Sequence, residues 1–279
     1  MKRSTVIILL FLSILTILGY TVLNNHENYD YKEIPEKEII NSKKIEKYRL
    51  RKHRHVTAFY QMLSEKVTET CMKDNIPPAA LLAIAGLESG WNSGYVGKIT
   101  GNILALGANK GDTTLPSLFL PRIKKTGEIL FDSLEILKYD KKDLIWEKRP
   151  KSWKKDYRPQ EIAGSKYNLA YFKYHPKEKS EAIAKNIDDF ISVFISKDSN
   201  IKAFRETKEL MNKLVKEKGK NILLKLETTY VFLNGIGGKK NSYNHRKSWL
   251  RKVKSIIKHA GLIELAKDLN SGKDFEETW

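Results

Sequence analysis

A glutamate lies where an apolar helix is expected to end. Apolar side chains precede Glu88 by three, four and seven residues, so its carboxyl group shares a helix face with them. Burial raises the pKa of a carboxyl group, and the negative end of a helix dipole acts in the same direction. A carboxyl that stays protonated near neutral pH can donate a proton to a glycosidic oxygen. Helix position alone is equally compatible with a glutamate that extends into solvent.

The residues around Glu88 resemble a known family. Residues 81–91, LLAIAGLESGW, resemble the signature of bacterial glucosaminidases, the domains of flagellar peptidoglycan hydrolases and many autolysins. Residues 102–106, NILAL, resemble the family's Asn-Leu-Phe-Gly-Ile stretch, and Tyr243 lies where the family has a tyrosine ahead of its last helix. The resemblance spans roughly residues 56–260, and only the block at 81–91 is specific.

This resemblance implies a fold and a reaction. The implied fold is lysozyme-like and mostly α (α+β), with a helical lobe and a small β or loop lobe that flank a groove. Glu88 would be the catalytic acid in hydrolysis of the glycan strand after N-acetylglucosamine. Trp91 and Asn102 would bind the substrate, and Tyr243 would take part in catalysis. From the residues alone, Trp91 is equally typical of a core residue that caps a helix, and Tyr243 of a packing residue.

The sequence departs from the family at the second carboxylate. Many members carry this group after a Thr-Thr pair, whereas Thr113 and Thr114 are followed here by leucine and proline. Glu128, 40 residues beyond Glu88, fits the family's spacing and is the predicted second catalytic residue; Asp112, 24 residues beyond, is the alternative. A reaction assisted by the acetamido group of the sugar would need neither. Glu128 is equally typical of a solvated hairpin residue.

A basic stretch with aromatic residues lies in the middle of the chain. Residues 138–159 combine nine basic residues with Tyr139, Trp146, Trp153 and Tyr157. Aromatic faces can stack on sugars or on bases, and lysines can bind carboxylates or phosphates. A surface loop that its tryptophans fasten to the core is the alternative interpretation.

The surrounding pattern predicts mostly helices. Apolar periodicity predicts one helix over about 43–72 and a second from Pro77-Pro78 to Gly90, a residue that suits a helix end. Residues 92–170 predict loops, with a short β-hairpin around 123–131. Helices resume at Ser180, expected as an N-cap, and the glycine run at 235–238 predicts an interhelical turn. Further helices are predicted near 203–217, 221–233, 246–259 and 261–269.

The N-terminus predicts a membrane anchor. An apolar run of 19 residues, 5–23, follows Lys2 and Arg3, and this length suits a hydrocarbon core of ~30 Å. No small-x-small cleavage site follows it. We therefore expect an uncleaved signal-anchor over 1–23, a polar tether over 24–42, and a domain over 43–279 on the extracytoplasmic side of the cell membrane. A cleaved signal peptide is the alternative.

Composition limits the function classes. The chain has 51 Lys and Arg against 33 Asp and Glu, a net charge of +18, which is typical of an anionic partner or of a Lys-rich proteome. No nucleic-acid motif is present and the anchor places the domain outside, so we expect no nucleic-acid partner. The single cysteine excludes an intramolecular disulfide, and the histidine spacing predicts neither a metal nor another cofactor.

Three functions follow from these observations. The leading one is a peptidoglycan hydrolase. The second is a non-catalytic wall-binding or scaffold protein on the same fold, and the third a membrane-tethered nucleic-acid-binding protein. The sequence leaves the oligomeric state open.

Overall fold

Helices account for most of the computed structural model, which describes residues 47–149 and 153–279 of the chain. This confirms the predicted mostly α class. The predicted signal-anchor over 1–23 and tether over 24–42 lie outside the described residues. Among the helices within the described ranges, none is both long and apolar enough to cross a bilayer.

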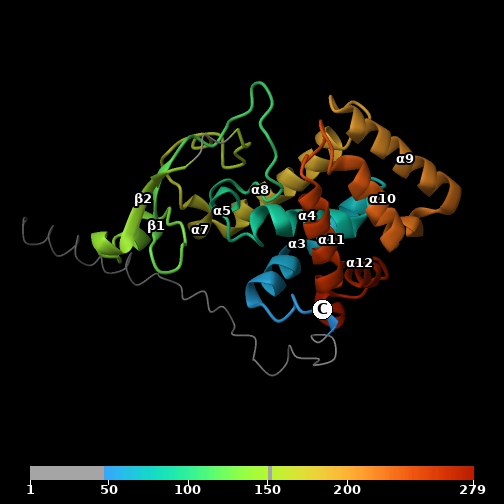
Figure 1. Cartoon of the computed structure of the whole chain (residues 1–279), viewed down its shortest axis with the longest axis horizontal. Coiled ribbons are helices and arrows are strands. Elements are labelled where there is room, and N and C mark those ends of the chain that lie inside the picture. Colours follow the sequence, from blue (N-terminus) through green and yellow to red (C-terminus); the bar gives the residue numbers. More distant parts are fainter. Residues whose placement is uncertain (1–46, 150–152) are drawn as a thin grey trace, which may run out of the picture. The chain divides into compact units, whose positions relative to one another are not determined.

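Helix α4 (Pro78–Ser89) lies at the centre of the helical part (Figure 1). It packs against α3 (Arg54–Lys73), α10 (Leu226–Ile236), α11 (Lys247–Ala260) and α12 (Leu262–Asn270). Every residue of α4 from Pro78 to Gly86 is buried, rather than a single apolar stripe. A helix that is apolar on all sides is one that other elements enclose. The end of α4 is therefore where a side chain of this helix can leave the core.

The predicted ends of α4 are confirmed. Pro78 opens the helix, where its missing N–H leaves no helical hydrogen bond unmade. Gly90 follows the helix with a φ of 57°, a left-handed conformation that glycine adopts without strain. Its amide donates to the carbonyl of Gly86.

The predicted helix over 43–72 is wrong over residues 48–53, which the structure describes and which are not helical, and α3 begins only at Arg54. Arg51 explains the difference. Its buried guanidinium donates to the Ala260 carbonyl at 3.0 Å and lies against the rings of Tyr48 and Trp279. These contacts with the C-terminal part of the chain determine the backbone before α3, where the sequence periodicity alone would continue the helix.

The remaining helical elements follow the predictions in most places. The predicted start at Ser180 is wrong, because α8 begins at Pro176 and the Ser180 hydroxyl donates back to the Pro176 carbonyl at 3.2 Å. The predicted helix near 221–233 is divided into a 3₁₀ segment and α10. The other helical elements are α5 (Tyr95–Thr100), α6 (Ser133–Ile136), α7 (Tyr171–Tyr174), α8 (Pro176–Asp189), α9 (Lys202–Lys218), α13 (Phe275–Thr278), the 3₁₀ segments Lys141–Asp143 and Lys220–Leu224, and a π-helical segment, Phe190–Phe194.

A small antiparallel sheet lies to one side of α4, and Leu120 of its first strand shares an apolar cluster with Ile99 of α5 (Figure 1). It pairs β1 (Phe119–Ile123) with β2 (Leu144–Lys148). The predicted hairpin around 123–131 is only partly present. The chain does turn back there, and the Ile123 amide donates to the Glu128 carbonyl at 2.8 Å. The returning segment makes a single bridge, between Arg122 and Ile129, and it is β2 that completes the sheet.

Candidate active site

The backbone turns sharply just after Glu88. Glu88 is the last but one residue of α4, and it is partly exposed where the preceding turns are fully buried. Gly90, Trp91 and Asn92 then have φ angles of 57°, 51° and 62° in succession. Left-handed backbone is strained for residues other than glycine, and such strain clusters at functional sites. The turn fixes Glu88 at the edge of the packed core.

Glu88 lies in the wall of a cavity of about 220 Å³. The cavity also has Lys154 in its wall, and residues 242–244, which precede α11, add polar groups. Its apolar lining includes Phe194 and Phe204. Among the described residues that line it, Glu88 is the one carboxylate and Lys154 the one cation. An apolar surface with a few convergent polar groups is typical of a small-molecule site.

Two neighbours act on the Glu88 carboxyl group. Trp249 Nε1 donates to Glu88 Oε1 at 2.8 Å. Burial raises the pKa of Glu88, whereas the Trp249 hydrogen bond and the positive charge of Lys154 act to lower it. For Lys154, burial disfavours the charged ammonium and so lowers the pKa, and the charge of Glu88 opposes that shift. The net result is a carboxyl group that keeps its proton to a higher pH than usual, as a general acid requires.

Trp249 owes its position to a glycine. The indole is buried in α11, and a Cβ added at Gly237 would lie 2.7 Å from Trp249 Cε3 and closer still to Cζ3. The ring of Tyr243 packs on the other rings nearby, with centroids 5.5 Å from Trp249 and 5.8 Å from Phe190. Gly237 and Gly238 thus lie in the turn between α10 and α11, whereas Gly235 and Ile236 still belong to α10, so the predicted turn over 235–238 is confirmed in its second half only. Gly237 also admits the indole that reaches Glu88.

Asn102 fixes the loop that forms one part of the cavity wall. Its Nδ2 donates to the carbonyls of Leu106 and Lys155 at 3.0 and 2.9 Å. Its Oδ1 accepts from the Leu106 amide at 2.9 Å and from Asn186 Nδ2 at 3.0 Å. Asn186, on α8, also accepts from the Leu104 amide at 3.0 Å. Because these four bonds use the whole side-chain amide, Asn102 positions the loop instead of offering a group to a ligand.

Tyr243 joins the same loop to the cavity. Its hydroxyl donates to the Leu104 carbonyl, and its ring lines the cavity with Glu88. Burial, and secondarily the negative charge of Glu88, raise the pKa of Tyr243 well above its ordinary value. The phenol therefore stays neutral. The structure thus brings together two of the predicted catalytic residues, Glu88 and Tyr243.

The other predicted residues lie elsewhere. The Trp91 indole donates to the Tyr60 hydroxyl at 3.3 Å and packs against the helical core, as its packing alternative describes. The Glu128 side chain is 56% exposed and lies 3.7 Å from Lys98 Nζ. Neither Glu128 nor Asp112 lines the Glu88 cavity. Within the described residues, the structure places no second carboxylate in the wall beside Glu88.

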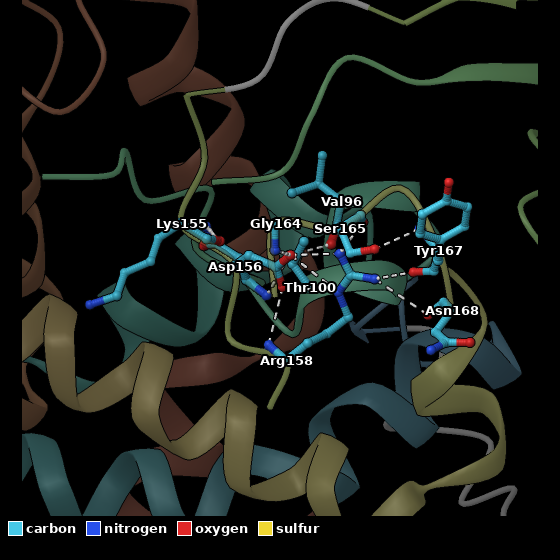
Figure 2. A network of polar contacts seen from close by, with 10 residues as sticks. Val96, Thr100, Lys155, Asp156, Arg158, Gly164, Ser165, Tyr167 and Asn168 are labelled. Atoms are coloured by element: carbon cyan, nitrogen blue, oxygen red, sulfur yellow. Dashed lines mark hydrogen bonds and ion pairs between the residues drawn. The ribbon is translucent and has the colours of Figure 1, made fainter. Parts of the chain in front are cut away.

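A buried ion pair secures the segment that carries Lys154 (Figure 2). Arg158 Nη2 lies 2.7 Å from Asp156 Oδ2, and both side chains are fully buried. Arg158 also donates to the carbonyls of Ser165 at 2.8 Å and Tyr167 at 3.0 Å. A buried pair of this kind is supported by additional hydrogen bonds of the charged groups. It fastens the chain two residues beyond Lys154 to the loop around 165–167.

Sequence reasoning missed three residues of the site. Trp249 is one of the apolar residues of the helix predicted near 246–259, and Lys154 is one of the nine basic residues of the stretch 138–159. Asn186 lies 84 residues from Asn102, and no motif connects them.

A larger hollow of about 450 Å³, bordered by Lys155, contains none of the predicted site residues. Within the described ranges, no group of His, Cys, Asp or Glu is arranged as metal ligands are.

The arrangement has a definite chemical capacity. A carboxyl group with a raised pKa can deliver a proton to a group bound in the cavity, a neutral phenol lies beside it, and an ammonium can bind an anion. Comparison of the chain with known protein families, characterised proteins and solved structures finds no match.

Proposed function

We propose that this chain is a peptidoglycan hydrolase that cleaves the glycan strand at N-acetylglucosamine, with Glu88 as the general acid. One observation carries the proposal. The Glu88 carboxyl is fixed by Trp249 in the wall of a cavity, and burial raises its pKa. A positioned carboxyl that holds its proton near neutral pH can protonate the leaving oxygen of a glycosidic bond. The resemblance of residues 81–91 to glucosaminidases supports the same reaction.

The proposal includes the fold and the location. We take the helical part around α4, with the small sheet and its loops, as a lysozyme-like arrangement in which the acid ends the central helix. The predicted anchor over 1–23 would hold the domain on the extracytoplasmic side of the cell membrane. That side is where the glycan strands of the wall lie.

A cavity with one carboxylate favours a particular route. Glu88 would first protonate the leaving oxygen, while the acetamido group of the substrate attacks the anomeric carbon from within the same sugar. Glu88, now ionised, would then take a proton from the water that opens the intermediate. If Glu128 acts as the second carboxylate instead, it must approach from outside the cavity wall seen here. The neutral Tyr243 would keep the wall at Leu104 in place.

The single carboxylate also favours the second candidate, a non-catalytic wall-binding protein on the same fold. Digestion of purified peptidoglycan by the full-length chain in detergent separates the two. We expect soluble fragments whose reducing ends are N-acetylglucosamine by mass spectrometry. Muramic acid at the reducing ends would reassign the bond that is cut. Binding to the wall without any release of fragments would support the non-catalytic protein.

A further inference from the structure

One face of the two-stranded sheet carries large apolar side chains that are exposed to solvent. Alternate residues of a strand share a face, so the register places Phe119 of β1 and Trp146 of β2 on the same side. Their rings stack with centroids 5.5 Å apart, and the two residues are 62% and 46% exposed. Leu120, on the opposite side, is buried in the cluster that contains Ile99 of α5. We call the side of Phe119 and Trp146 the outer face of the sheet.

Helix α6 lies against one end of this outer face. Its Ile136 packs with Ile123 and Leu144, which pair at the end of the sheet on the side of the outer face. Leu134 and Leu137 of the same turn are, in contrast, 60% and 80% exposed. Two leucines and two aromatic rings are therefore exposed on one side of the sheet.

Buried contacts hold α6 in place. Asp132, which is buried, accepts from the Leu134 amide at 2.9 Å, so it caps the helix. It also accepts from Lys173 Nζ at 2.8 Å and from the Tyr174 hydroxyl at 3.0 Å. The exposed leucines thus belong to a fixed part of the fold. Single exposed apolar residues are ordinary, but several gathered on one face mark an interaction surface.

Lysines surround these apolar side chains. Lys148 pairs with Phe119 across the strands and so shares the outer face, and Lys124 Nζ donates to the Lys142 carbonyl in the segment between α6 and β2. The exposed lysines of residues 119–149 are Lys124, Lys125, Lys138, Lys141, Lys142 and Lys148. Of the six acidic residues in this range, four pair with other cations, which leaves Asp140 and Asp143 near these lysines. The surface therefore has an excess of positive charge.

We infer that the outer face of the sheet, with α6, docks on the surface of an anionic lipid bilayer. Leucines can enter the boundary of the acyl chains, aromatic rings prefer the level of the headgroups, and lysines meet the lipid phosphates. A glycan strand could stack on Phe119 and Trp146, but it has no apolar interior that would bury Leu134 and Leu137. The charge and the leucines together therefore favour lipid. This inference does not depend on the proposed hydrolase activity.

The chain ahead of the described residues is long enough to permit this contact. If the predicted anchor ends at residue 23, residues 24–46 connect it to the described part, and a chain of this length reaches at most about 80 Å. Docking would replace this long radius by direct contact. The domain would then act next to the membrane and not throughout the depth that its tether allows.

The test uses the full-length chain in vesicles, with a fluorescent reporter on α6. A Ser133→Cys chain is labelled with an environment-sensitive dye, while the buried Cys71 stays unmodified. The vesicles contain phosphatidylcholine with or without phosphatidylglycerol, spin-labelled lipid that quenches the dye, and so few chains that most hold one copy. We expect quenching that requires phosphatidylglycerol and decreases with added salt. The same dye on Leu210→Cys, at a residue of α9 that is 41% exposed, should stay unquenched.

Variants of the Ser133→Cys chain assign the contact to particular side chains. Leu134→Ser combined with Leu137→Ser should lower the ratio of docked to undocked chains at least about tenfold, because burial of even one leucine contributes that much. Lys138→Gln should lower the ratio about fivefold. The matched controls are Val231→Ser, at a residue of α10 that is 41% exposed, and Lys213→Gln, at a side chain of α9 that is 71% exposed. Neither control should change the quenching.

Several results would overturn the assignment. Equal quenching at positions 133 and 210, absence of quenching at 133, or quenching that ignores phosphatidylglycerol each contradicts docking on anionic lipid. A signal that appears only when many chains share a vesicle would assign the outer face to a second copy of the chain. A response of the dye to glycan strands added to phosphatidylcholine vesicles would assign it to the wall. Because no cleavage is measured, failure here leaves the proposed function standing, and an inactive chain leaves this inference testable.

Discussion

At the scale of single residues, Glu88 experiences effects of opposite sign. Burial raises its pKa, and both the Trp249 hydrogen bond and the charge of Lys154 oppose the rise. A carboxyl in this balance can be protonated before the reaction and ionised after the proton has left. Either neighbour alone can then shift the pH at which the site works.

Replacing Glu88 by Gln tests the assigned acid. General acid catalysis contributes roughly 10²–10⁴ in rate, so Glu88→Gln should reduce hydrolysis by at least ~10² and remove the alkaline limb of the activity–pH profile. The folded-state pKa of Glu88 is raised, so its contribution to stability is present at acid pH and lost as pH rises through that pKa. The Gln variant should therefore gain stability relative to the parent between acid and neutral pH, as urea denaturation can measure. Hydrolysis near the parent rate would refute the role of Glu88.

Replacing Trp249 by Phe removes the N–H that Glu88 accepts. The hydrogen bond lowers the pKa of Glu88, so Trp249→Phe should move the alkaline limb to higher pH while the maximal rate falls through poorer orientation. The matched control is Trp279→Phe, which removes an indole hydrogen bond to Thr57 Oγ1 of 3.0 Å. If both variants show the parent pH profile, Trp249 serves packing alone.

The residues of the site differed in how far the sequence could reveal them. Glu88 was identifiable because the residues around it resemble the glucosaminidase signature, and Tyr243 because the same resemblance implies a tyrosine ahead of the last helix of the domain. Lys154 and Trp249 were not, because their types are ordinary in a basic loop and an apolar helix face. Their roles arise only because the fold brings Lys154 and Trp249, which are far from Glu88 in the sequence, close to the Glu88 carboxyl group.

At the scale of elements, local signals predicted α4 best. A proline and a glycine mark its ends, and their backbone preferences act regardless of tertiary structure. The start of α3 could not be predicted in this way, because a buried arginine bound to C-terminal carbonyls decides it. The pairing of β1 with β2 could not be predicted locally either, because α6 lies between the two strands in the sequence.

Gly237 offers a test of how an interhelical turn positions a side chain. Its φ of −143° suits any residue, so the effect of Gly237→Ala should come from the clash with the Trp249 ring. We expect a loss of about 1–3 kcal/mol in unfolding free energy, together with a fall in activity. Combining it with Trp249→Leu, which removes the clashing ring, should give a loss well below the sum of the two single losses. Additive losses would mean that the methyl group acts elsewhere.

At the scale of the whole molecule, the sequence predicted the class but not which helix is central. Periodicity reports which face of a helix is apolar, and α4 has no polar face over its first turns. Its place at the centre follows from the helices that surround it, which no local pattern encodes. Charge, in contrast, is a property of the whole chain that the sequence states directly.

The net charge of +18 should determine how the protein meets an anionic wall. Electrostatic attraction at a surface weakens as the Debye length falls from about 30 Å at 0.01 M salt to about 10 Å at 0.1 M. Sedimentation with intact cell wall should therefore show binding that decreases across this range, whereas binding to neutral chitin should change little. Wall binding that is independent of salt would mean that the excess of lysine has no part in it.

The segment at 102–106 has no helix or strand, yet two of its amides donate to buried side-chain oxygens. Leu104 donates to Asn186 and Leu106 to Asn102. Loop amides usually exchange their hydrogens for deuterium quickly, because small local openings expose them. We expect these two to exchange as slowly as amides of α4, and the exposed Asn109 amide to exchange fast. A loop with such protection meets its ligand already ordered, so binding would not carry the entropic cost of ordering it.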